Sequence, residues 1–199
     1  MRAVVRHAFV VAAAVVIAAC GNQMEPAQKA ITDIESAVAA AGADAEKYIP
    51  EQVAAVKGSV DALKAAFDQK DYKSVVTGAP AVLAEAQGLV AAAAAKKDEV
   101  MAALNGEWTQ LSTELPAAVT AIQGRIDELS KAKKLPEGLD KAAVEGAAAG
   151  LSEAQTLWTE ATNAFGAGAV EEAVTKANAV KAKANELMSA LGMTAAPAA

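Results

Sequence analysis

The chain has 199 residues, of which 54% are hydrophobic and 4% aromatic, and its formal net charge is −6. An acidic chain is a poor candidate for binding nucleic acid, because attraction to phosphates supplies most of the non-specific affinity. The single histidine, His7, and the single cysteine, Cys20, both lie near the N-terminus. The chain beyond Cys20 therefore offers no disulfide, no histidine base and no thiolate or imidazole metal site.

Residues 1–19 have the layout of a secretory signal. Arg2 and Arg6 form a positive head, residues 8–19 are uncharged and apolar, and small residues end the run. A transmembrane helix needs ~20 apolar residues, and this run is shorter and is followed by polar residues. We therefore expect residues 1–19 to be a signal peptide.

The end of this run, Ile17-Ala18-Ala19-Cys20, resembles the lipobox of bacterial lipoproteins. The resemblance is confined to residues 1–20 and implies that a signal peptidase recognises Ile17, Ala18 and Ala19 and cleaves before Cys20. It also implies a diacylglyceryl thioether on Cys20 and acylation of the new amine. Three acyl chains form a stable anchor, since each buried methylene contributes ~0.8 kcal/mol. The alternative is an ordinary signal peptide that ends near a cysteine by chance.

Charge and sorting signals predict where the anchored chain lies. Without Arg2 and Arg6, 16 basic and 24 acidic residues remain, a net charge of −8. Anionic headgroups repel such a surface, so the lipid rather than a basic patch must hold the protein to the membrane. In the sorting pattern of two-membrane bacteria, aspartate after the lipidated cysteine retains a protein in the inner membrane. Gly21 therefore favours the outer membrane, facing the periplasm, or the outer face of the cell membrane in a one-membrane host.

After a tether at residues 20–25, the chain is predicted to be helical. Alanine, leucine, glutamate and lysine dominate, and apolar residues recur at three- and four-residue steps. Pro50-Glu51 and Pro136-Glu137 are typical helix starts, whereas Pro80 and Pro116 should kink or split their helices. We expect a disordered tail at 192–199 and six helices, at about 26–42, 51–67, 70–104, 107–133, 137–165 and 169–191.

The chain also matches itself at a shift of 98 residues. The alternative is that two alanine-rich helices converged on similar patterns, because alanine matches count for little. A second likeness, between residues 49–51 and 135–137, has a shift of 86. The non-alanine identities at the shift of 98 are Phe67/Phe165, Val76/Val174, Thr77/Thr175, Val82/Val180 and Leu89/Leu187.

These patterns predict an all-α fold. Alanine-rich stripes with the spacing of a coiled-coil seam pack closely against partner helices. We expect an elongated antiparallel helical bundle of about six helices, arranged as two related three-helix units at 26–104 and 105–191.

Few side chains of the predicted bundle are candidates for binding. Aromatic residues on the apolar stripes are interpreted as core, and Tyr48 and Tyr72 fall near helix ends, where a hydroxyl stays in water. A lysine cluster at the end of the fourth helix and Glu171-Glu172 at the start of the sixth complement the helix dipoles. The aromatic stripe residues are Phe67, Trp108, Trp158 and Phe165, and the lysines are Lys131, Lys133 and Lys134.

The function expected from these features is a non-enzymatic envelope lipoprotein, a helical interaction or spacer domain anchored to a membrane through Cys20. It would contact another envelope protein and use no cofactor, metal or nucleic acid. The alternative is a carrier for an apolar ligand held between the two helical units, which would need a cavity of a few hundred Å³.

Overall fold

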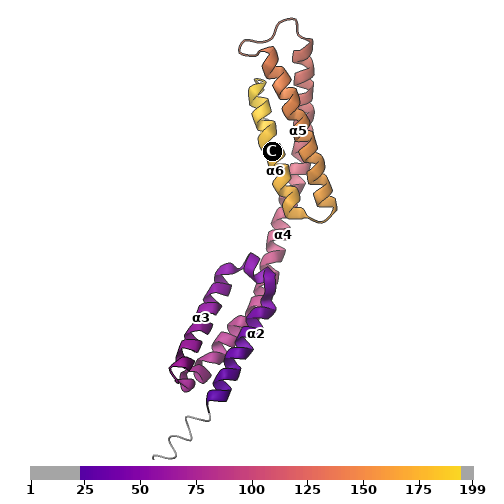
Figure 1. Ribbon diagram of the computed structural model, residues 1–199. Coiled ribbons are helices and arrows are strands. Elements are labelled where there is room, and N and C mark those ends of the chain that lie inside the picture. The colour runs from indigo at the N-terminus through magenta and orange to yellow at the C-terminus, as the bar shows by residue number, and fades with distance from the viewer. Residues whose placement is uncertain (1–22, 194–199) are drawn as a thin grey trace, which may run out of the picture. The chain divides into compact units, whose positions relative to one another are not determined.

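The computed structural model describes residues 23–193 (Figure 1). The predicted signal peptide, Cys20 and residues 194–199 of the predicted tail lie outside these described residues. Between residues 23 and 193 the chain forms five helices and no strand, which confirms the all-helical prediction. The helices are α2 (Met24–Tyr48), α3 (Pro50–Asp68), α4 (Tyr72–Lys131), α5 (Lys141–Gly166) and α6 (Val170–Ala190).

Tertiary contacts divide the chain into two compact units, one up to Glu99 and the other from Val100. The first unit contains α2, α3 and the first part of α4. One face of each helix is buried, because its apolar residues recur at three- and four-residue steps. The core comprises Ala27, Ile31 and Ile34 of α2, Val53, Val56, Val60 and Leu63 of α3, and Val75, Ala79, Ala86, Leu89 and Ala93 of α4.

The second unit contains the rest of α4 together with α5 and α6. Its core follows the same pattern but carries aromatic residues near one end. Gly150 of α5 is buried, and a Cβ there would lie 2.9 Å from Leu187 Cδ2 of α6. The missing side chain therefore lets α5 and α6 approach closely. Core residues include Leu111, Leu115, Ile122 and Ile126 of α4, Ala147, Leu151 and Ala154 of α5, and Ala177, Val180 and Leu187 of α6.

The predicted break at Asn105-Gly106 is wrong, and α4 is one helix of 60 residues where two were expected. The Asn105 side chain donates a hydrogen bond to the Met101 carbonyl at 2.8 Å, so it supports the helix instead of a turn. Pro80 and Pro116 do not split α4 either. Each follows a buried residue, Ala79 or Leu115, and packing of these faces offsets the cost of an interior proline, about 3 kcal/mol.

Gly42 was expected to end the first helix, but α2 resumes beyond it and continues to Tyr48. The backbone of Gly42 is non-helical (φ 62°, ψ −161°), a conformation that only glycine adopts readily. Two ion pairs hold the segment after the break: Glu46 with Lys57 of α3 at 2.6 Å, and Asp44 with Lys97 of α4 at 2.9 Å. The glycine signal was thus real, but it marks a break within α2 and not the end of α2.

The two proline signals have different outcomes. Pro50 begins α3 with Glu51 in the first turn, as predicted. Pro136 does not begin α5, because Gly138 adopts a left-handed conformation (φ 85°) and the helix starts at Lys141. Asp140 caps that start, since its carboxylate accepts a hydrogen bond from the Ala143 N–H at 2.7 Å.

Candidate functional site

The residues predicted from the sequence to form the site, Ile17, Ala18, Ala19 and Cys20, lie outside the described residues. The structure does describe the segment that follows them, which is the start of the folded domain. Gln23 precedes α2, which begins at Met24. Only residues 21–23 therefore separate Cys20 from a helix.

The start of α2 shares one end of the first unit with the turn between α3 and α4 (Figure 1). This follows from the chain path, because α3 returns antiparallel to α2 and α4 then leaves from the end at which α2 began. We call this end the proximal tip and define it as Met24 together with residues 67–72. Met24 is 47% exposed, which is unusual for a large hydrophobic residue in this fold.

The turn of the proximal tip is fixed by two backbone hydrogen bonds. The Asp71 N–H donates to the Ala66 carbonyl at 2.9 Å, and the Lys70 N–H donates to the Phe67 carbonyl at 2.8 Å. This pair of bonds is the Schellman motif, which places one residue in the left-handed region. Here that residue is Lys70 (φ 65°), where glycine is usual. The Phe67 and Tyr72 rings meet edge to face, 5.0 Å apart, across the turn.

Asp71 caps the N-terminus of α4. Its carboxylate accepts a hydrogen bond from the Ser74 N–H at 3.2 Å. Hydrogen bonds from the Ser74 side chain and backbone lower the pKa of Asp71 below its ordinary value. The negative charge of Asp71 is therefore engaged with the helix that follows.

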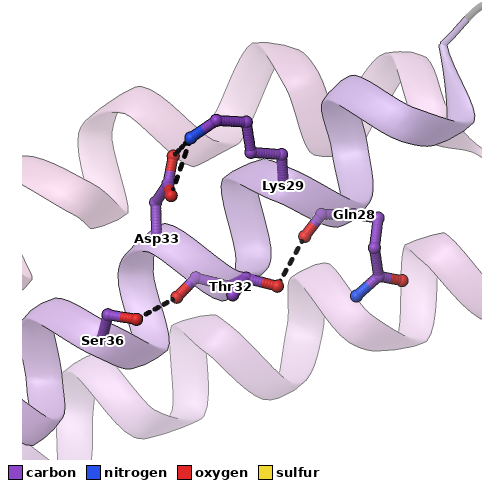
Figure 2. Close-up of polar contacts among 5 residues, drawn as sticks. All are labelled: Gln28, Lys29, Thr32, Asp33 and Ser36. Carbon is purple, nitrogen blue, oxygen red and sulfur yellow. Dashed lines mark hydrogen bonds and ion pairs between the residues drawn. The ribbon is translucent and has the colours of Figure 1, made fainter.

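The polar side chains on the adjoining face of α2 are engaged within the helix (Figure 2). Lys29 Nζ lies 2.9 and 2.6 Å from the two carboxylate oxygens of Asp33. The Thr32 hydroxyl donates to the Gln28 carbonyl at 3.1 Å, and the Ser36 hydroxyl donates to the Thr32 carbonyl at 2.8 Å. This face has no convergent constellation that would suggest catalysis.

The second unit has a turn of the same construction between α5 and α6. The Ala169 N–H donates to the Ala164 carbonyl, and the Gly168 N–H donates to the Phe165 carbonyl, both at 2.9 Å. Gly168 (φ 81°) occupies the left-handed position. The ring of Phe165 stacks on Trp108 at 4.5 Å.

The prediction that the aromatic stripe residues belong to the core is confirmed for Trp108, and the other three are partly buried. Trp108 is 8% exposed and belongs to the core, while Trp158 is only partly buried and stacks on Trp108 at 5.5 Å. Phe67 and Phe165 are also partly buried and pack against the cores of their units. Tyr48 and Tyr72 lie at helix ends, as expected: one ends α2 and the other begins α4.

Lys133 of the lysine cluster lines a hollow of about 580 Å³ at one end of the second unit. Lys131 is the last residue of α4, as the dipole argument predicted, and Lys133 and Lys134 follow it. Lys141, also on the hollow, lies 3.5 Å from Glu145. The apolar lining consists of Leu129, Leu135, Leu139 and Val144.

A groove of about 480 Å³ lies between α2 and α3 beside Gly42. Ion pairs cross it, Lys64 with Glu35 and Lys57 with Glu46, both at 2.6 Å. The hydrogen bond to Glu35 raises the pKa of Lys64 above its ordinary value, which keeps the lysine charged. The paired charges neutralise each other, so the groove is better explained as a place where ion pairs join α2 and α3 than as a reaction centre.

Residues 23–193 contain no group of three or more histidine, cysteine, aspartate or glutamate side chains that could hold a metal ion. Within the same range, one helix is long and apolar enough to cross a membrane: an 18-residue window of α4 has a mean hydropathy of 1.4. Length and composition alone are weak evidence for a span. Much of this hydropathy comes from alanine, and α4 packs against α2 and α3 through Val75, Ala86 and Leu89.

Comparison with known proteins gives no matching family model, no similar curated protein and no similar solved structure.

Proposed function

We propose that the protein is a membrane-anchored envelope lipoprotein whose helical domain acts without catalysis, as an interaction or spacer domain. The observation that carries the proposal is the position of Cys20. The lipobox cysteine ends the apolar run, and the first helix begins at Met24. A signal peptide, a lipid-bearing cysteine and a folded domain thus follow one another with a three-residue spacer.

The character of the bundle supports a role in contact or spacing. Within residues 23–193, every buried residue that forms the core is apolar, and no polar or charged side chain is buried. Ion pairs such as Lys176–Glu160 and Lys183–Glu153 clip neighbouring helices together on the surface, each at less than 3 Å. Such a bundle offers several helical faces to a partner.

We also propose that the two units are related three-helix copies, as the shift of 98 residues suggests. The turns support this, because Lys70 and Gly168 occupy equivalent left-handed positions exactly one shift apart in number. The starts of α4 and α6, Tyr72 and Val170, obey the same shift. The buried pairs Val75/Ala173, Ala79/Ala177, Ala86/Ala184 and Leu89/Leu187 also obey it.

Lipidation is tested by expressing the full chain in a bacterial host and measuring the intact mass of the membrane-extracted protein. The expected mass is that of a chain starting at Cys20 plus a diacylglyceryl group and an amide-linked acyl chain. Cys20→Ser should leave the protein unprocessed and without lipid. An unmodified Cys20 in the wild-type protein would overturn the proposal.

Location is tested by separating the two membranes of such a host. The wild-type protein should sediment with the outer membrane, and Gly21→Asp should move it to the inner membrane. Crosslinking in the native envelope then tests the interaction role. A specific crosslinked partner is expected, and its absence across several crosslinkers would count against an interaction domain and leave the spacer role.

A further inference from the structure

We propose that the proximal tip of the first unit, Met24 with residues 67–72, is a membrane-contact surface that rests on the lipid headgroups. The inference depends on the proposed lipidation of Cys20. It goes beyond that anchor by assigning a second contact, made by the folded domain itself and formed by residues far apart in the sequence.

The short spacer keeps the start of α2 close to the membrane. Residues 21–23 separate Cys20 from Met24, so the two Cα atoms are at most roughly 14 Å apart. The headgroup layer on one side of a bilayer is about 5–8 Å thick. A Cys20 whose acyl chains lie in the hydrocarbon core therefore holds the start of α2 at the membrane surface.

The turn at residues 67–72 lies at the same end of the unit as Met24 (Figure 1). Its composition suits an interface between water and lipid. Met24 exposes 47% of its surface, and Tyr72, packed edge to face on Phe67, has an apolar ring with a polar hydroxyl. Such amphipathic rings are favoured at the headgroup level of membranes.

Lys70 provides an independent indication. It holds a left-handed backbone conformation (φ 65°), which disfavours a side chain, whereas the equivalent turn of the second unit has Gly168. A lysine is thus present where glycine would fold more easily. Its long aliphatic stem can lie along the surface while its ammonium group contacts a lipid phosphate.

The remaining charges make the tether necessary. The tip carries Asp68, Lys70 and Asp71, and Glu25 follows Met24, so acidic side chains outnumber the lysine. An untethered domain should therefore bind vesicles poorly. Lipid on Cys20 raises the local concentration of membrane around the tip and turns a weak contact into a persistent one.

The test uses the full lipidated protein in phosphatidylcholine vesicles whose headgroups carry a nitroxide, which quenches tryptophan on contact. The background variant is Trp108→Phe with Trp158→Phe. Tyr72→Trp reports the proximal tip, and Tyr48→Trp is the matched control at the other end of α2, roughly 35 Å away at 1.5 Å per residue. Quenching at position 72 should exceed that at position 48 several-fold, and equal quenching would overturn the contact.

A second measurement leaves both native tryptophans in place, in case the background variant unfolds. A fluorophore that responds to polarity is attached to Met24→Cys or, as control, to Glu51→Cys at the start of α3. Only the label at position 24 should report a less polar environment on vesicles. The mass of the lipid on Cys20 and flotation with vesicles are recorded on the same samples. Missing lipid overturns the proposed function, whereas lipid and flotation without any tip signal overturn only this inference.

The role of Lys70 has its own arm in vesicles that contain anionic lipid. Lys70→Arg should keep the quenching at position 72, and Lys70→Gly should reduce it about two-fold or more. Unchanged quenching in Lys70→Gly would remove the lysine from the contact surface.

Discussion

The turns that close the two units share one backbone and differ in side chains. Both are Schellman motifs with the same two hydrogen bonds, yet the left-handed residue is Lys70 in the first unit and Gly168 in the second. The aromatic residue before each turn also has different neighbours. Phe67 meets Tyr72, whereas Phe165 stacks on Trp108. The two turns therefore share their hydrogen bonds and a phenylalanine, and they differ in the left-handed residue and in the ring that the phenylalanine contacts.

The largest expected effect on stability distinguishes the Trp108 cluster of the second unit from the Phe67–Tyr72 pair of the first. Trp108→Ala should lower the free energy of unfolding by about 3–5 kcal/mol, because the ring is buried and stacked on two others. Phe67→Ala should cost clearly less, since Phe67 is only partly buried. Urea unfolding followed by circular dichroism measures both. Equal losses in the free energy of unfolding would show that the two aromatic clusters contribute equally to stability.

The next effect concerns the close approach of α5 and α6 in the second unit. Gly150→Ala should destabilise by about 1–3 kcal/mol, because its Cβ would lie 2.9 Å from Leu187 Cδ2. Gly146→Ala, one turn earlier and open to solvent, should stabilise by about 0.5–1 kcal/mol. Thermal unfolding of the two variants should therefore shift in opposite directions, and a shared direction would contradict the packing argument.

Exchanging the left-handed residues of the two turns addresses the comparison directly. Lys70→Gly should stabilise the protein by about 1 kcal/mol, and Gly168→Lys should destabilise it by a similar amount. Chemical denaturation of the unlipidated domain measures both without any membrane. If Lys70→Gly is neutral or destabilising, the lysine contributes to folding, and its conformational cost is no longer evidence for another role.

The smallest effect is a pH dependence that the turn of the first unit has and its counterpart lacks. Asp71 caps α4, and Ser74 lowers its pKa, whereas Ala169 stands at the equivalent position. A lowered pKa means that the cap is fully stabilising above the unfolded value of about 3.9 and is lost as the pH falls through the folded value. The urea midpoints of wild type and Asp71→Ala should therefore differ at neutral pH and converge in acid. Parallel curves would show that the carboxylate does not act as a cap.

Local signals predicted much of the fold. Proline with a following acid marked the start of α3, and the three- and four-residue apolar spacing predicted helix faces that are buried, as Val56, Leu63 and Leu187 are. The errors occurred where packing or a competing cap prevailed. Asn105-Gly106 lies within a continuous helix, and Asp140, four residues after Pro136, starts α5.

The two parts of the candidate site also differ in whether the sequence alone could predict them. The proposed lipobox, residues 17–20, is a contiguous pattern and can be recognised from the sequence alone. The proximal tip is not, because it joins Met24 to a turn more than forty residues later in the chain, and only the return of α3 beside α2 brings them to one end. The conformation of Lys70 was equally hidden, since no local rule assigns a left-handed backbone to a lysine.

The cap of the last helix has a consequence for how such a chain can lengthen. α6 ends where Gly192 turns left-handed (φ 65°) and the Met193 N–H donates to the Met188 carbonyl at 2.9 Å. Its counterpart one shift earlier, Ala94, lies inside α4, which continues into the second unit. Glycine thus stands where α6 stops, and alanine stands where α4 continues. On the proposed repeat, replacing Gly192 with a helix former would remove the stop of α6, so that a further unit could follow on a continuous helix as the second unit follows on α4.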